Sequence, residues 1–354
     1  MATPKVSTVK TLVEKPGLTH IPPTYAFQTR SASDQEIPSN EAAGEPEGPI
    51  PIVDFSLLTS GTPDQRSTII QDLRNICQDW GCFMVINHGV DESLLNKILD
   101  GCREFFDLED KEEKKEYEGK KILDTICYGT STDGPPSEAL FWRDYLRVRV
   151  HPEFHSPRKP AGFSEVLAAF SEGVRGVVRD LLGGISESLG LESSHIYRAL
   201  DVESSLQLFV ANFYPPCPQP ELALGLPSHT DPGLLTLLMQ NGINGLQLQR
   251  KGKWINANII SGAFFVQIDD HLEVFTNGKY KSVTHRAVVN NKSTRISIAV
   301  VNGPSLDTVV SPELELLGNG SHTAAYAEMK YKDYLELRYK KSLNGNSTLN
   351  HIKI

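Results

Sequence analysis

The chain has 354 residues, of which 39% are hydrophobic and 22% charged, as expected of a globular protein with a large core or two lobes. Its formal net charge of −9 argues against a nucleic-acid surface and against docking on an anionic membrane. No apolar run has the length of a transmembrane helix, and the N-terminus lacks a secretory signal. We therefore expect a cytoplasmic protein with no obligate protein partner.

The first half of the chain predicts an α/β region that follows a polar lead. Residues 1–48 are expected to form a flexible lead and linker, because 31–49 are rich in Pro, Gly, Glu and Ser. The α/β region spans 49–203, with strands predicted at 50–55 and 82–86 and helices at 64–80, 91–106 and 163–189. The charged run 109–121 is interpreted as a solvated helical face, and 122–160 as loops that can carry specificity.

The second half predicts many short strands separated by glycine-containing turns. The strands are expected at 206–214, 234–240, 246–249, 254–259, 264–268, 282–289 and 295–301. This pattern predicts a double-stranded β-helix (jelly-roll) core over 204–304, so the fold class is mainly β with flanking α. Residues 305–354 are expected to be a helical extension, with a C-terminal helix at about 324–342 that packs across the barrel.

A candidate metal site is formed by His229, Asp231 and His285. Side chains two residues apart on a strand point to the same face, so one extended segment could present both His229 and Asp231 to an ion. Two imidazoles and a carboxylate can hold one face of an Fe(II) ion and leave the opposite face open. The same residues would suit a catalytic zinc, which indicates a hydrolase, and a single histidine is more typical of a structural residue.

A second pair, Arg295 and Ser297, lies on the predicted strand that follows His285. A guanidinium binds a carboxylate through two parallel hydrogen bonds, and a hydroxyl can bond the same group. The conjunction of this pair with the three candidate ligands predicts a metal site that also binds an acidic small molecule able to chelate the metal.

Several longer motifs accompany these residues. They are Ile50–Asp54, Trp80–Gly89, Trp142–Leu146, Asn212–Pro218, His229–Thr236, Asn277–Val283 and His285–Arg286. With them the chain resembles, over nearly its whole length, the plant-type Fe(II)/2-oxoglutarate-dependent dioxygenases, whose relatives include flavonol synthase, flavanone 3-hydroxylase, anthocyanidin synthase and the salicylate hydroxylases. The motifs are specific for the family and say little about any one substrate.

The resemblance implies Fe(II) as the metal, 2-oxoglutarate and O2 as cosubstrates, and ascorbate as a reductant. His229, Asp231 and His285 match the family's iron ligands, and Arg295 with Ser297 matches the pair that binds the distal carboxylate of 2-oxoglutarate. Asn212 and Tyr214 match further cosubstrate contacts, although a buried strand tyrosine is an equal explanation for Tyr214. One departure is Asp269, which stands where the family usually has glycine and leaves the local backbone geometry open.

The substrate is less constrained than the site. Val301, Phe213, Tyr128 and Trp142 are candidate wall residues, with ordinary core positions as the equal alternative. The resemblance implies hydroxylation of a small phenolic, flavonoid-like or hormone-like metabolite, coupled to conversion of 2-oxoglutarate to succinate. Oxidative demethylation or desaturation by the same chemistry is the first alternative. A catalytically idle protein that binds or senses a small molecule on the same scaffold is the second.

Overall fold

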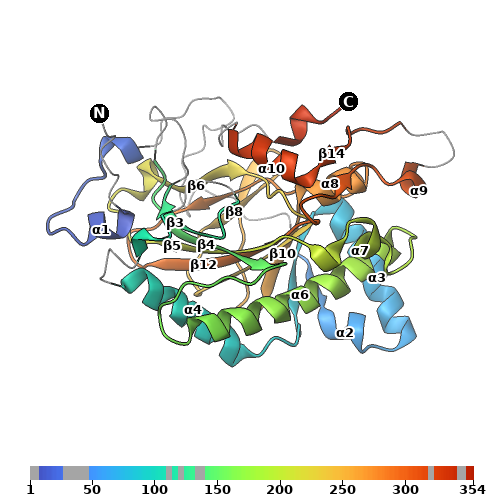
Figure 1. Cartoon of the computed structure of the whole chain (residues 1–354), viewed down its shortest axis with the longest axis horizontal. Helices are drawn as coiled ribbons and strands as arrows, with labels where there is room; N and C mark the ends of the chain where they lie inside the picture. The colour runs from blue at the N-terminus through green and yellow to red at the C-terminus, as the bar shows by residue number, and fades with distance from the viewer. Residues whose placement is uncertain are drawn as a thin grey trace.

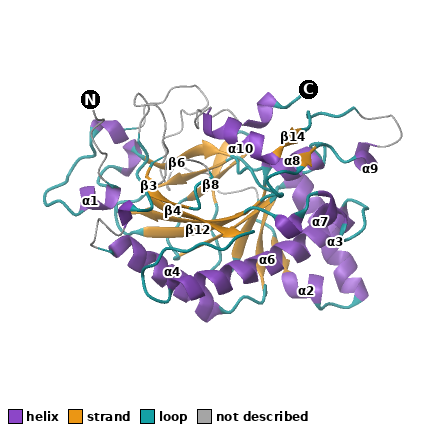
Figure 2. Cartoon of the chain, in the orientation of Figure 1, coloured by secondary structure: helices purple, strands orange, loops and turns teal. Residues whose placement is uncertain are grey.

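A large sheet forms the centre of the molecule, with a smaller sheet on one face and long helices on the other (Figures 1 and 2). This structure is a computed structural model, and it describes residues 8–26, 48–108, 114–118, 123–131, 140–317, 323–340 and 348–354. The two facing sheets confirm the predicted jelly-roll core and the mainly β class with flanking helices.

The large sheet has eight strands, and the small sheet has four. In spatial order the large sheet contains β1 (Ile52–Asp54), β2 (Cys82–Ile86), β10 (Phe264–Ile268), β7 (Leu235–Gln240), β12 (Arg295–Asn302), β5 (Gln207–Tyr214), β4 (Asp144–His151) and β3 (Ile126–Thr130). The small sheet contains β6 (Leu224–His229), β11 (His285–Val288), β8 (Leu246–Arg250) and β9 (Lys253–Asn256). Strands β13 (Val309–Val310) and β14 (Met329–Lys330) form a separate pair.

Three long helices cover one face of the large sheet (Figure 1). They are α3 (Pro63–Asp79), α4 (Glu92–Asp107) and α6 (Phe163–Ser188), close to the predicted bounds. Helix α3 begins at a capping box, in which Thr62 and Gln65 satisfy each other's backbone N–H groups. The shorter helices are α1 (Val9–Val13), α2 (Phe55–Thr59), α7 (His195–Ala199), α8 (Asp270–Phe275), α9 (Leu314–Leu317) and α10 (Tyr331–Lys340). None of the helices in the described ranges is both long and apolar enough to cross a bilayer.

The strands of the large sheet present a different set of residues to each side, because side chains alternate along a strand. On β12, Ile296 and Ile298 pack into the core beneath the helices, together with residues of α6. Ala299 packs on the other side, in the core between the two sheets. Arg295 shares that second side, which we call the interior face, so the fold directs this predicted site residue between the sheets.

Residues 122–160 are not the loop segment that was expected. Strands β3 and β4 lie within them and extend the large sheet. On β4, Leu146 and Val148 are fully buried, whereas Arg147 and Arg149 on the other side are half-buried. Apolar and charged residues alternate from Leu146 to Val150, which is the two-residue period of a strand, so the sequence does carry a signal for β4.

Two further expectations need correction. Residues 8–26 of the expected flexible lead pack against the domain, because Val9 and Tyr25 are buried beside Trp142. Lys114, in the run interpreted as a solvated face, is also buried. Its ammonium donates to the Phe106 carbonyl at 2.8 Å, and burial lowers its pKa to about 8. Residues 27–47, 109–113 and 119–122 of these segments lie outside the described residues.

The C-terminal helix is shorter than predicted. Residues Met329 and Lys330 pair with β13 instead of joining α10. The N–H groups of Ala325 and Ala327 bond to the Asn277 side chain and to the Ile352 carbonyl. These contacts with distant segments replace helical hydrogen bonds, and they cannot be read from local periodicity.

The buried carboxylate of Asp144 provides a test of the packed N-terminal segment. Its two oxygens accept the backbone N–H groups of Val9 and Lys10 at 2.9 and 2.8 Å. We predict that Asp144→Ala lowers the free energy of unfolding by about 1–3 kcal/mol, because two buried donors lose their acceptor. Urea denaturation measures this loss, and faster tryptic cleavage after Lys15 should accompany it. The control Asp100→Ala, on the exposed side of α4, should change stability by under about 0.5 kcal/mol, and an equal loss in both variants would contradict the prediction.

Candidate metal centre

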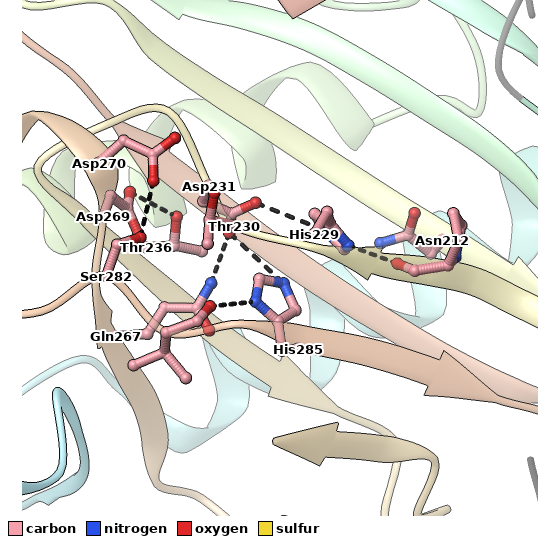
Figure 3. A network of polar contacts seen from close by, with 12 residues as sticks. Asn212, His229, Thr230, Asp231, Thr236, Gln267, Asp269, Asp270, Ser282 and His285 are labelled. Atoms are coloured by element: carbon pink, nitrogen blue, oxygen red, sulfur yellow. Dashed lines mark hydrogen bonds and ion pairs between the residues drawn. The ribbon is translucent and has the colours of Figure 1, made fainter. Parts of the chain in front are cut away.

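The three predicted metal ligands come together between the two sheets (Figure 3). His229 ends β6 and stands directly opposite His285, the first residue of β11. The two His Nε2 atoms lie 3.6 and 3.9 Å from the carboxylate oxygens of Asp231. Donor atoms that bind one ion at about 2.1 Å lie roughly 3–4 Å apart. The three side chains therefore fit a single metal ion.

The histidine rings are oriented by the backbone of their own strands. Nδ1 of His229 lies 2.8 Å from the Pro227 carbonyl, and Nδ1 of His285 lies 3.0 Å from the Val283 carbonyl. A carbonyl only accepts hydrogen bonds, so each Nδ1 carries the proton. The Nε2 lone pair of each ring is thereby left to bind a metal.

Electrostatics favour the same protonation states. Burial, with help from the neighbouring His285, lowers the pKa of His229 to about 3. Burial alone would raise the pKa of Asp231, but His285, His229 and Arg338 outweigh it and hold that pKa below its usual value. A neutral imidazole at His229 and an ionised carboxylate at Asp231 are the states that bind a divalent metal.

The expected reason for the His-x-Asp spacing is wrong. His229 is the last residue of β6, and Asp231 lies in the loop beyond it, so the two ligands do not share one face of a strand. Strand β6 was also missing from the predicted strands. It contains Gly225 and Pro227, and it lies at the edge of the small sheet, where proline is tolerated.

Asp231 is held by residues that the sequence did not single out. Gln267 of β10 donates its amide N–H to a carboxylate oxygen of Asp231 at 2.5 Å. The backbone N–H of Asp270 donates to the Asp231 carbonyl at 2.9 Å. A polar residue in the otherwise apolar run Phe264–Ile268 was the available signal for Gln267.

Asp269, the departure from the family pattern, lies beside this network (Figure 3). Its φ of −105° is ordinary extended backbone, so the position does not require glycine. Thr236 donates its hydroxyl to Asp269 Oδ2 at 2.9 Å, and Oδ1 is buried with no hydrogen-bond partner among the described residues. Burial and the charge of Asp231 raise the pKa of Asp269 well above its usual range, which disfavours the charged form of this side chain.

Helices α8 and α10 hold the loop that carries Asp231. On α8, Nδ1 of His271 lies 2.6 Å from the Pro232 carbonyl oxygen. From α10, Tyr334 donates its hydroxyl to the Asp270 carboxylate at 2.7 Å. Arg338 donates to the Thr230 carbonyl. The C-terminal helix therefore positions a metal ligand as well as covering the barrel.

The second half of the site lies on β12 and β5. Arg295 stands opposite Tyr214, and Ser297 stands opposite Asn212, with the Asn212 amide donating to the Ser297 hydroxyl at 3.4 Å. The four residues predicted to bind the cosubstrate are thus neighbours on the interior face. Arg143 extends the set, because its guanidinium donates to Asn212 Oδ1 at 3.1 Å.

Arg295 is only 2% exposed, and its guanidinium is incompletely bonded. Nε and Nη2 donate to Gln240 Oε1 at 3.1 and 3.0 Å, but Nη1 is buried with no partner in the described part of the chain. Glycine at 245 makes room for the side chain, since a Cβ there would lie 2.8 Å from Arg295 Cδ. A buried, partly bonded guanidinium beside a serine hydroxyl fits the carboxylate of a ligand.

The predicted substrate wall is largely misplaced. Phe213 and Tyr128 belong to the core beneath the helices, where the Phe213 ring lies 5.0 Å from that of Phe106. Trp142 is fully buried, and its indole N–H donates to the Pro215 carbonyl at 3.1 Å. Phe213 and Tyr128 therefore point away from the space between the sheets, whereas Trp142 packs in a core cluster with Tyr214 and Ala287. Val301 does face this space, because it is two residues from Ala299 along β12.

Two histidines and one carboxylate near a buried arginine–serine pair match the chemistry of a non-haem iron site that takes a chelating keto acid. The model of the 2OG-Fe(II) oxygenase superfamily matches residues 205–304, and that of the N-terminal region of a non-haem dioxygenase in morphine synthesis matches 50–166. The rice protein 2-oxoglutarate-dependent dioxygenase 19 is 42% identical over 315 residues, which cover 89% of this chain and 93% of that protein. The chain belongs to the 2OG-Fe(II) oxygenase superfamily and is a 2-oxoglutarate-dependent dioxygenase, an oxidoreductase that uses Fe(II) and O2.

Other relatives agree with this assignment. The rice protein flavanone 3-dioxygenase 2 is 37% identical over 308 residues, which cover 85% of this chain and 86% of that protein. The crystal structure of JOX2 in complex with 2OG, Fe and JA superposes with a TM-score of 0.81 at 28% identity, covering 93% of this chain and 92% of that chain.

The buried ring of His271 generates a prediction about pH. Burial lowers its pKa to about 4, whereas the unfolded side chain titrates at 6.5. As the pH falls, the His271 imidazole is therefore protonated in the unfolded state before it is protonated in the folded state. Its contribution to the free energy of unfolding is fully present above pH 6.5 and is lost as the pH falls toward 4. We predict that between pH 7 and 5 the metal-free parent loses about 2 kcal/mol more stability than His271→Asn. Urea denaturation at both pH values measures the difference, and parallel losses would contradict a neutral buried His271.

The incompletely bonded Arg295 generates a second prediction. Arg295→Ala should raise the apparent KM for 2-oxoglutarate by about 10- to 100-fold, because a charge-assisted pair of hydrogen bonds is lost. Steady-state assays over a range of 2-oxoglutarate concentrations measure this change. The control Arg103→Ala, which removes an exposed guanidinium on α4, should leave the KM unchanged. Parent-like kinetics in the Arg295 variant would show that this residue does not bind the cosubstrate.

Proposed function

We propose that the protein hydroxylates a small phenolic, flavonoid-like or hormone-like metabolite, with His229, Asp231 and His285 as the iron ligands. The observation that carries this proposal is that the three ligands come together between the two sheets, the region toward which the incompletely bonded guanidinium of Arg295 is directed. The relatives support the substrate class. They include flavanone 3-dioxygenase 2 from rice and deacetoxyvindoline 4-hydroxylase from Catharanthus roseus, and the solved structures include a rice dioxygenase for auxin oxidation.

The protein's own contribution to the reaction is to fix the cosubstrate at both ends. Arg295 and Ser297 would hold the distal carboxylate of 2-oxoglutarate, and this directs its keto-acid end toward the metal ligands. When they are bound, the iron and 2-oxoglutarate activate O2 to an oxidant that can break a substrate C–H bond. The two fixed ends hold the reacting groups in one geometry, which removes much of the entropic cost of bringing them together.

The surroundings of the ligands also exclude water from the reacting groups. His229 and His285 have side chains that are only 8% exposed, and Asp231 is 14% exposed. Leu238 and Ala299 contribute an apolar surface between the sheets. Exclusion of water there would protect the reacting groups from side reactions, and the apolar surface would help to orient the substrate C–H bond.

The first test of this proposal removes one metal ligand. We predict that His229→Ala loses bound iron and at least about 100-fold of its activity, because two remaining ligands do not retain the ion. Metal analysis after anaerobic loading measures the iron, and succinate formation with 2-oxoglutarate, O2 and ascorbate measures the activity. The control His20→Ala removes an exposed histidine and should retain both. A His229 variant with full iron content would contradict the assignment.

Product analysis by mass spectrometry separates the reaction outcomes. Addition of one oxygen atom to the metabolite identifies hydroxylation, whereas loss of a methyl group or of two hydrogens identifies demethylation or desaturation. A protein that binds a metabolite but releases no succinate under any of these conditions would be a sensor on this scaffold, and the proposal would be wrong.

A further inference from the structure

The interior face of the large sheet is ordered into rows of residues that stand opposite one another on neighbouring strands. One row contains two of the proposed cosubstrate residues, Asn212 and Ser297, and it reads Tyr145, Asn212, Ser297 and Gln240 across β4, β5, β12 and β7. The row two residues further along contains Arg147, Val210, Ala299, Leu238 and Phe265. The third row contains Arg149, Leu208, Val301, Thr236 and Gln267.

The third row connects the metal centre with β4. Gln267 at one end donates to the iron ligand Asp231, and Arg149 stands at the other end. The first row already holds the tail of the cosubstrate under the proposed function. The space that remains for the organic substrate therefore lies above the second and third rows, between the metal ligands and the two arginines of β4.

The floor of this space is apolar and accessible. Leu208, Val210 and Ala299 are half-buried, whereas Phe209 and Ala211 on the opposite side of β5 are fully buried. Strands lie about 4.8 Å apart, so β4 is about 10 Å from β12. This span matches a molecule of one or two rings that lies across β5.

The far end of the same space is positively charged. Arg147 and Arg149 point to the interior face, because the alternate residues Leu146, Val148 and Val150 fill the core beneath the helices. Nε of Arg149 is buried and makes no hydrogen bond to any described residue. Its Nη2 lies 3.5 Å from His155 Nε2 and 3.8 Å from Glu153 Oε2, but Glu153 is 75% exposed, and such a surface pair is weak.

We propose that Arg149 and Arg147 bind a carboxylate on the organic substrate, so that the protein oxidises a small and otherwise apolar carboxylic acid. This inference rests on the proposed function and adds a substrate class to it. Two planar guanidinium groups suit a carboxylate better than a neutral hydroxyl, because each can donate two parallel hydrogen bonds. The arrangement also predicts which carbon reacts, since the end remote from the carboxylate would lie at the metal.

The test compares acids with their uncharged esters. The probes are phenylacetic, cinnamic and indole-3-acetic acids and the methyl ester of each. Calorimetric titration under anaerobic conditions, with the protein loaded with Fe(II) and 2-oxoglutarate, measures their binding. We expect at least one acid to bind about 10-fold or more tightly than its ester, because the ester cannot accept a charge-assisted pair of hydrogen bonds. The unmodified protein is used, so this comparison does not depend on the folding of a variant.

Variants then locate the preference. Arg149→Gln and Arg147→Gln should each weaken acid binding by about 10-fold while ester binding stays the same, and Arg149→Lys should restore part of the loss. The control Arg103→Gln should bind acid and ester as the parent does. Circular dichroism and thermal unfolding verify that each variant is folded.

Two results would overturn the inference. One is equal binding, or no binding, of every acid and its ester by the parent. The other is an acid preference that persists in both glutamine variants. Succinate release from 2-oxoglutarate without any organic probe reports on the proposed function separately. Iron-dependent release without an acid preference would therefore refute the carboxylate site and leave the dioxygenase assignment intact.

Discussion

The interior of the two-sheet core contains a buried positive charge that the protein bonds only in part. Desolvating the guanidinium of Arg295 is costly, and an anionic partner must offset that cost. Gln240 satisfies two of its N–H groups, whereas Nη1 finds no acceptor within the described residues. Space for the side chain depends on glycine at 245, and Ser297 places a hydroxyl beside it. A carboxylate that bound here would supply the acceptor that Arg295 Nη1 lacks among the described residues.

The remaining geometry follows from holding the other end of that ligand. His229 and His285 come from paired strands of the small sheet, whereas Arg295 comes from the large sheet, so the distance across the cosubstrate is set by how the sheets pack. Asp231 lies outside both sheets and depends on a different support. Gln267 bonds its carboxylate, and α10 contacts its loop through Arg338. Three separate parts of the fold must therefore be in place before the metal site is complete.

The sequence predicted the parts of this protein that depend on local chemistry. The long helices and most strands of the core could be found from residue type and period, and the candidate ligands that residue type suggested do come together between the sheets. The predictions that failed depend on which side of a strand a residue faces and on contacts between residues that are distant in the sequence. Phe213 sits beside two cosubstrate residues in sequence but faces the helices, because neighbouring strand positions alternate. Strand β4 lies in a segment that was expected to be loops, although its apolar and charged residues alternate as in a strand, and the buried sheet directs Arg147 and Arg149 inward.

The most direct measurement of the central claim changes the ligand and leaves the protein unaltered. The metal-loaded protein is titrated anaerobically with 2-oxoglutarate and with 2-oxovalerate, which keeps the chelating keto acid but lacks the distal carboxylate. The buried guanidinium should make 2-oxoglutarate bind about 2–3 kcal/mol more tightly, since only this ligand supplies the missing acceptor. Equal affinities for the two keto acids would contradict the account, because Arg295 would then have no part in holding the cosubstrate.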